Sequence, residues 1–344
     1  IDGKLNLVQH KSNESEFALS NDFSIKMINF EINSQSNQKN DKLLFSDDID
    51  LILKKHSFTL ADNVHRIDAA EIGILSTQNR IYVKDAKLYP MILSSWFEKM
   101  PLTFFAEIPL IDINKTDIFG LLKNGEMPID QLKIHQPKMK LLLNNQVKQN
   151  AEKENKKPVF LLKNLQLLKA NKIVIENGLL EVAKYENQKS RSIAHTKINF
   201  ELDKLHIANK NDKFETNYNN VMIGLADLNF DLPDNRHVFN IEHITYQQNA
   251  KNLVSKNISL KPKSETDTKQ RAQYFNISVP VMQINGFDFF DYIESNELKL
   301  KSISINQPNI SISDKRIDSR TKFSFYDNNW HSDLNSIFKT ISIE

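Results

Sequence analysis

Histidine and aspartate, the residue types here best suited to acid–base or metal chemistry, recur together at one matching pair of places. Among the nine histidines, only His65 and His237 are equivalent, in the strings Asp62-Asn63-Val64-His65 and Asp234-Asn235-Arg236-His237. Aspartate and histidine side chains that converge in a loop could bind a metal or exchange protons. An Asx-type turn between two strands explains the same residues without a ligand. We interpret both strings as turns.

Two further acids, Asp117 and Asp288, stand at the start of segments that we expect to form short helices, residues 116–123 and 287–295. A carboxylate at a helix start accepts hydrogen bonds from free amides and faces the positive end of the helix dipole. No second acid accompanies either residue at a fixed spacing, so helix capping explains them better than catalysis.

Motifs of known catalytic and cofactor sites are absent from the sequence. It contains no G-x-S-x-G, H-E-x-x-H or EF-hand pattern and no glycine-rich phosphate loop. The absence of cysteine excludes thiol enzymes, disulfide scaffolds and cysteine-ligated zinc folds. We therefore predict a protein that is not an enzyme and that uses no metal and no cofactor.

The charge balance argues against a nucleic-acid partner. Lys and Arg number 45 against 43 Asp and Glu, so no basic field is present. The longest apolar stretches, residues 90–97 and 159–162, are far shorter than the ~20 residues of a membrane-spanning helix. The hydrophobic content of 40% is sufficient for a packed core.

The elements that would position any site are duplicated along the chain. Residues 104–141 match residues 275–312 without a gap at an offset of 171, and residues 58–90 match residues 230–262 at an offset of 172. The string INFE recurs as well, at residues 28–31 and 198–201. We predict two tandem β-rich units, residues 1–171 (with a polar loop at about 145–157) and residues 172–344.

The two ends of the sequence fall inside one repeated motif. Ile1-Asp2-Gly3 is similar to the tail of Ile173-Val174-Ile175-Glu176-Asn177-Gly178, and Ile341-Ser342-Ile343-Glu344 is similar to its beginning. We expect the chain to be a fragment of a longer repeat protein, with flanking repeats as neighbours.

Short runs of alternating apolar and polar residues dominate both units and predict β-strands with one apolar and one solvated face. Gln136-Pro137 and Gln307-Pro308 interrupt pairs of such runs, where proline indicates a bend. The predicted fold is all-β with a few short helices, an elongated curved antiparallel sheet or β-groove of two tandem repeats.

In such a groove the apolar face would shield acyl chains from water, at ~0.8 kcal/mol for each buried methylene. Its candidate lining residues are Ile25, Met27, Phe30, Ile32, Ile72, Ile74, Ile134, Ile198, Phe200, Leu202, Ile303 and Ile305.

The repeated strand–Pro–strand phrases, residues 132–141 and 303–312, together with Asn177-Gly178 between two strands, resemble the units of AsmA-like envelope proteins, a family that includes TamB-type proteins. The resemblance implies a repeating β-groove in the periplasm or cell envelope of a Gram-negative bacterium. It implies phospholipid or another acyl-chain lipid as the cargo, and inner- or outer-membrane proteins as further partners. It supplies no catalytic residues. A composition rich in Asn, Lys and Ile would suit a Bacteroidetes-type organism.

Two other functions fit the same pattern. A structural or adhesive β-repeat spacer would have a closed, dry core. A carbohydrate- or protein-binding pair of β-sandwiches would carry exposed aromatic residues at its loop ends, although Trp96 and Trp330 do not match across the repeat.

Overall fold

The chain is mainly β-strand, as a computed structural model shows. The structure describes residues 2–11, 14–32, 45–60, 65–91, 102–144, 166–186, 189–210, 213–232, 236–263, 272–295, 297–315 and 341–343. Helices in this part of the chain are short: η2 (Ser76–Gln78), α2 (Ile118–Asn124) and α3 (Phe289–Ser295). The predicted fold class, all-β with a few short helices, is confirmed.

The chain separates into two compact units. Unit 1 comprises Ile1–Ser192 and Ile198–Asn219, and unit 2 comprises Ile193–Lys197 and Asn220–Glu344. This division follows spatial contacts. The boundary that the repeat indicates, between residues 171 and 172, stays a prediction.

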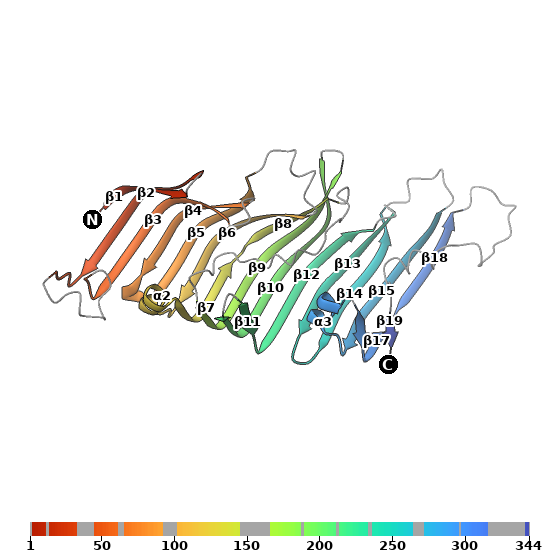
Figure 1. The fold of residues 1–344 in the computed structure, drawn as a ribbon. Coiled ribbons are helices and arrows are strands. Elements are labelled where there is room, and N and C mark those ends of the chain that lie inside the picture. The colour runs from red at the N-terminus through yellow and green to blue at the C-terminus, as the bar shows by residue number, and fades with distance from the viewer. Residues whose placement is uncertain are drawn as a thin grey trace. The chain divides into compact units, whose positions relative to one another are not determined.

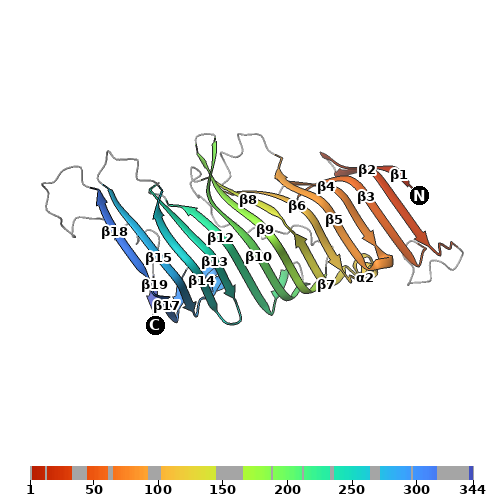
Figure 2. The same ribbon diagram turned by 180° about the vertical axis from the view of Figure 1, so that it is seen from behind.

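The strands of unit 1 follow one another through the sheet largely in chain order, as Figures 1 and 2 show. Each pair from β1–β2 to β5–β6 is antiparallel. The strands are β1 (Asp2–Lys11), β2 (Glu14–Ile28), β3 (Asp48–Thr59), β4 (His65–Leu75), β5 (Arg80–Pro90), β6 (Leu102–Asn114), β7 (Glu126–His135), β8 (Lys138–Leu143), β9 (Leu167–Glu186), β10 (Lys189–Lys210) and β11 (Lys213–Asn217).

Unit 2 repeats this order from β12 onward. Its main sheet again pairs consecutive strands antiparallel, and a separate small sheet joins β16 to β19. The strands are β12 (Asn220–Asp231), β13 (His237–Gln247), β14 (Asn252–Pro262), β15 (Ala272–Asn285), β16 (Leu298–Leu300), β17 (Ser302–Asn306), β18 (Asn309–Lys315) and β19 (Ile341–Ile343).

The pairing differs from the predicted antiparallel sheet at one recurring place. β7 and β8 both pair with β6 antiparallel and with β9 in parallel, and β16 pairs with β19 in parallel. A parallel neighbour requires a long connection, and 23 residues separate β8 from β9. Alternation alone does not distinguish the two directions, so the sheet is mixed where an antiparallel one was predicted.

The duplication extends to the register of individual residues. His65 lies opposite Pro90 in unit 1, and His237 lies opposite Pro262 in unit 2. The same holds where β8 and β18 join their neighbours, because Glu107 lies opposite Lys138 as Ser278 lies opposite Asn309. Equivalent residues therefore have equivalent neighbours in both units.

The short helices begin where the sequence predicts. The Asp117 side chain accepts a hydrogen bond from the Gly120 amide at 2.9 Å, and that of Asp288 accepts one from the Asp291 amide at 3.2 Å. Both aspartates are N-terminal caps, as predicted.

Candidate functional site

One face of the unit 1 sheet is formed by aliphatic and aromatic side chains in continuous rows across the strands. Side chains of residues directly opposite each other on paired strands project from the same face. The pairings therefore define two rows that run from β2 to β9. The first consists of Ile25, Leu51, Ile74, Ile81, Ile113, Leu132 and Ile173, and the second of Phe23, Leu53, Ile72, Val83, Ile111, Ile134 and Ile175. We call this the apolar face.

The apolar face of unit 2 has the same plan. Rows cross from β12 to β17 or β18 by direct opposition. Their members are Ile223, Tyr246, Leu253, Ile284 and Ile303 in one row, Leu225, Ile244, Ser255, Met282 and Ile305 in the next, and Phe230, Phe239, Leu260, Ile277 and Ile310 in a third.

A line of exposed residues crosses each sheet and marks a bend in its strands. In alternate strands of unit 1 the residue on this line has a left-handed backbone: Lys55 (φ 53), Asp85 (φ 48) and Gln136 (φ 45). The equivalent residues of unit 2, Asp227, Asn257 and Gln307, have φ values of 55, 52 and 45. The bend predicted at Gln136-Pro137 and Gln307-Pro308 is part of this line.

The bend keeps apolar side chains on one face along the whole strand. In a regular strand, residues three apart project from opposite faces. Here Ile241 and Ile244 both pack in one cluster with Ile258, although the exposed Glu242 lies between them. The cluster also holds both Val279 and Met282 of β15. Apolar side chains from both sides of the line thus lie on one shared face.

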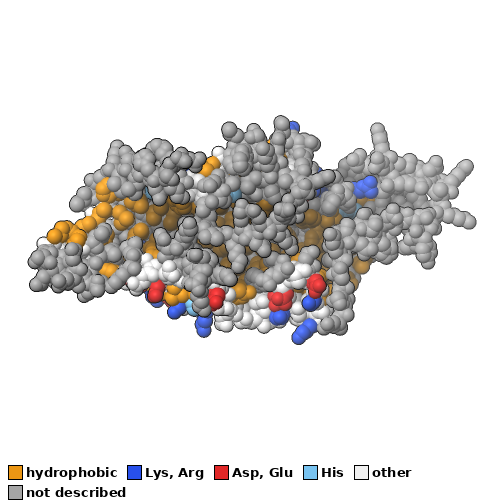
Figure 3. Space-filling view, viewed as in Figure 1, with side chains coloured by type: hydrophobic (Ala, Val, Ile, Leu, Met, Phe, Trp, Pro, Cys, Tyr) orange, Lys and Arg blue, Asp and Glu red, His pale blue; other side chains and the backbone are white. Residues whose placement is uncertain are grey.

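Most side chains of the apolar face are half-buried rather than sealed from solvent. Figure 3 shows hydrophobic side chains at several places on this side of the molecule, with charged side chains along the lower margin. A sheet face that is apolar and partly accessible can hold a nonpolar ligand without specific polar contacts.

The opposite face of unit 1 is polar and crossed by ion pairs. Arg80 Nε lies 2.7 Å from Asp112 Oδ1, and Lys84 Nζ lies 2.7 Å from Glu71 Oε1. The hydrogen bond from Lys84 is the main reason that the pKa of Glu71 is lowered. These pairs hold neighbouring strands together.

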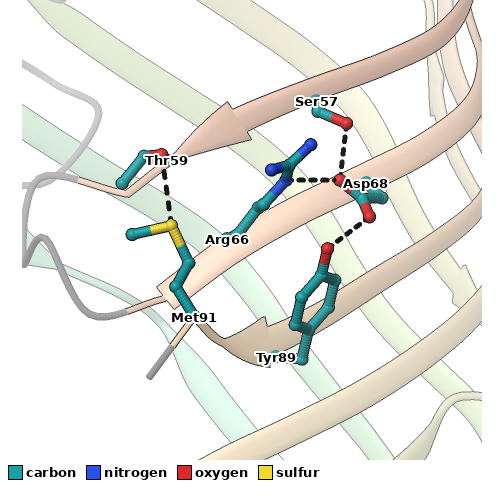
Figure 4. A network of polar contacts seen from close by, with 6 residues as sticks. All are labelled: Ser57, Thr59, Arg66, Asp68, Tyr89 and Met91. Carbon is teal, nitrogen blue, oxygen red and sulfur yellow. Dashed lines mark hydrogen bonds and ion pairs between the residues drawn. The ribbon is translucent and has the colours of Figure 1, made fainter. Parts of the chain in front are cut away.

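Asp68 is the centre of the densest polar network on this face (Figure 4). Its carboxylate accepts hydrogen bonds from the Ser57 hydroxyl, the Arg66 guanidinium and the Tyr89 hydroxyl. Burial acts to raise the pKa of Asp68, but the hydrogen bonds from Ser57, Tyr89 and Arg66 lower it overall. An ionised, fully hydrogen-bonded carboxylate stabilises the strands and is a poor proton acceptor.

The two repeated histidines are buried at the strand ends. His237 Nε2 accepts a hydrogen bond from the Phe275 amide at 3.0 Å, and its ring packs against Tyr274 and Phe275. His65 is buried at the equivalent position. The adjoining residues 61–64 and 233–235 lie outside the described ranges, as do the polar loop at about 145–157 and both tryptophans. Within the described residues, no group of three or more His, Asp or Glu side chains is placed to hold a metal ion.

Most of the residues predicted to line a groove lie on the apolar face. Pairings place the following there: Ile25, Met27, Ile72, Ile74, Ile134, Ile303 and Ile305. Ile198 of β10 joins them, because a Cβ on Gly178 would lie 2.8 Å from Ile198 Cγ2 and 3.2 Å from the buried Pro137. Phe200 and Leu202 follow at alternate positions of the same strand, so they share its orientation.

The placement of Phe30 and Ile32 in a strand was wrong. β2 ends at Ile28, and Asn29 adopts a left-handed backbone (φ 52). The Asn29 side chain donates to the Asp47 carboxylate at 2.8 Å, and beyond the strand the Glu31 amide donates to the Phe45 carbonyl at 2.9 Å. Phe30 and Ile32 are 52% and 66% exposed beyond the end of the strand.

Residues beyond the bend were missed by the sequence analysis. They include Phe58, Ile67, Leu88, Ile108, Met139 and Leu180, which continue the apolar face on the far side of the line. A search for a strict two-residue period misses them, because the apolar positions shift by one residue at the bend, as between Val83 and Ala86. The signal was an apolar pair spaced by three in the middle of a strand.

Comparison with known proteins gives no family assignment. No family model matches the chain, and no characterised protein matches it significantly. The resemblance to AsmA-like proteins stays a prediction. Among the described residues, no helix has the length and hydrophobicity that a membrane crossing would require.

Proposed function

We propose that this chain binds acyl chains of lipids along its apolar face and is not an enzyme. The observation that carries the proposal is the continuity of the apolar rows across the strands of each unit, on both sides of the bend. A row that spans β2 to β9 at ~4.8 Å per strand covers about 30 Å. This is comparable with the hydrocarbon core of a bilayer, which is two acyl chains thick.

The energetics favour a long nonpolar ligand. Each methylene transferred from water to this face contributes ~0.8 kcal/mol, so a chain of ordinary length gains affinity from contact area alone. A surface of this kind accepts different acyl chains, because it makes few directional contacts. A binding surface that needs few directional contacts agrees with a sequence that contains no catalytic or cofactor-binding motif.

The resemblance to AsmA-like proteins supports a more specific form of the proposal. In that form the ligand is phospholipid, the place is the periplasm or cell envelope of a Gram-negative bacterium, and the groove conducts lipid between the two membranes. Flanking repeats of the same kind and membrane proteins at the ends would be its partners.

The first test is mass spectrometry of organic extracts from the purified chain, with an unrelated, identically washed β protein as the control. We expect phospholipid at a stoichiometric ratio. A folded, monodisperse and lipid-free protein would overturn the proposal and favour the structural spacer.

A photo-crosslinking amino acid localises the ligand. Placed at Ile72, it would face the apolar side of β4, whereas at the neighbouring Glu71 it would face the polar side. We expect lipid adducts from position 72 and none above background from position 71. Equal labelling at the two positions would mean that lipid adheres to the protein without using the apolar face.

A further inference from the structure

One titratable side chain interrupts the apolar face of unit 1. His56 of β3 lies directly opposite Ala69 of β4 and follows Lys55, a residue of the bend. Its ring centroid lies 6.1 Å from that of Phe58, two residues further along the same face. Ala69 is buried. The other residues named above on the unit 1 apolar face are aliphatic or aromatic, so His56 is their one polar member.

The fold leaves this imidazole incompletely hydrogen-bonded. Nδ1 of His56 is buried without a hydrogen-bond partner. Burial lowers the pKa of His56, so the ring is neutral at pH 7 and carries one N–H group. A buried N–H without an acceptor is avoided in proteins, so the proton belongs on Nε2. Since the side chain as a whole is only half-buried, the Nε2–H group is available to donate to a ligand.

Unit 2 shows that the fold does not require a histidine at this position. The equivalent residue is Leu228, which packs against the cluster of Ile241 and Ile258. A buried polar atom without a partner costs stability, whereas leucine at the same place adds to the packing. Residues that break the local pattern at such a cost are typical of functional sites. The apolar faces of the two units thus differ by one hydrogen-bond donor.

We propose that His56 binds the carbonyl oxygen at the polar end of an acyl chain, with Nε2–H as the donor and the hydrocarbon along the neighbouring apolar rows. This inference rests on the proposed function, since it adds one polar contact to the same face. A free carboxyl group and an ester both offer such an oxygen. Among apolar side chains a hydrogen bond is stronger than in water, so this contact fixes the orientation of the ligand.

Three ligands of equal chain length test the contact on the delipidated chain: palmitic acid, methyl palmitate and hexadecane, each in competition with a pyrene-labelled acyl probe. We expect the wild type to bind one or both oxygenated ligands about tenfold more tightly than hexadecane, as one net hydrogen bond allows. In His56→Leu this preference should disappear while hexadecane binding persists. His56→Gln, which keeps an N–H donor, should restore part of the preference.

The matched control is His135→Leu, the same exchange on the polar face of unit 1. His135 Nδ1 and Lys133 Nζ lie 3.8 Å and 2.7 Å from the Glu176 carboxylate, away from the apolar rows. This variant should keep the wild-type preference. Tight binding of methyl palmitate would identify an ester as sufficient, and tight binding of palmitic acid alone would identify a free fatty acid; both support the contact. Equal preferences in the wild type and His56→Leu would overturn this inference alone. Failure of the wild type to bind any of the three ligands would overturn the proposed function together with it.

Discussion

The two units have the same strand register, but the row of residues that lies beside the bend on the apolar face consists of different side chains in each unit. In unit 2 the row is Leu228, Ile241, Ile258 and Val279, and it forms a packed cluster. In unit 1 the corresponding residues are His56, Ala69, Ala86 and Ile108. The bend and the strand pairing are therefore the same in both units, whereas the volume of the side chains in this row differs.

This difference has a consequence for stability. Ala69 and Ala86 of unit 1 are buried, at 3% and 4% exposed, as are Ile241 and Ile258 of unit 2, at 7% and 8%. Because two isoleucines bury more apolar surface than two alanines, unit 2 gains more of its own stability from this row.

Truncating the unit 2 cluster should have the largest effect. Ile241→Ala removes buried methylenes that contact Ile258 and Val279, at an expected loss of about 2–5 kcal/mol in the free energy of unfolding. Urea denaturation followed by circular dichroism measures it. Glu242→Ala, at the exposed neighbouring position, is the control and should change stability little. A loss of under about 0.5 kcal/mol for Ile241→Ala would show that the row is not a core.

The bend should be the next most sensitive feature, and equally so in both units. Asp85→Val and Asn257→Val each put a β-branched residue at a positive φ, which costs about 1–2 kcal/mol. The matched Asp85→Gly and Asn257→Gly variants relieve the backbone and should lose less. If valine and glycine were equivalent, the bend would not require a left-handed backbone.

Much of the fold could be predicted from the sequence because strand alternation and the duplication are local patterns. The helix caps at Asp117 and Asp288 and the interruptions at Gln136 and Gln307 follow from side-chain chemistry at single positions. The parallel pairing of β9 with β7 and β8 could not be predicted, because strand direction depends on distant partners.

The sequence pattern identified the residues of the apolar face on one side of the bend and missed those on the other side. Residues such as Ile72 and Ile74 lie in a run with a regular two-residue period. Leu88 and Met139 lie beyond the bend, where the period restarts after an exposed left-handed residue such as Asp85 or Gln136. Phe30 was misplaced for a related reason, since Asn29 also has a positive φ but ends the strand.

Replacing His56 of unit 1 by leucine, the residue at the equivalent position of unit 2, should have a smaller effect on stability, and this effect should depend on pH. Burial lowers the pKa of His56, and its Nδ1 is buried without a hydrogen-bond partner. His56→Leu should therefore raise stability by about 1 kcal/mol. Because the folded-state pKa lies below the ordinary 6.5, the wild type is penalised as pH falls below 6.5, when the unfolded chain takes up the proton more readily.

Unfolding midpoints between pH 5 and pH 8 test this comparison. The advantage of His56→Leu over the wild type should grow toward pH 5 and be smallest at pH 8. The reverse exchange, Leu228→His, should make unit 2 sensitive to acid in the same range. An advantage for His56→Leu that is independent of pH would mean that the imidazole is not titrating in the buried position.

The smallest effect is expected on the polar face, where the units again differ. Asp68 and Ser57 of unit 1 correspond to Asn240 and Asn229 of unit 2, whose side chains hydrogen-bond to each other. Asp68→Asn removes an ion pair that is partly exposed to solvent, so the loss at pH 7 should stay below about 1 kcal/mol. The pKa of Asp68 is lowered from 3.8, so its contribution is present above that value and disappears as pH falls through the lower, folded-state pKa. Denaturation at pH 7 and pH 3 should show a wild-type advantage that shrinks with acid. An advantage that persisted at the lower pH would mean that the hydrogen bonds from Ser57 and Tyr89, rather than the charge, carry the effect.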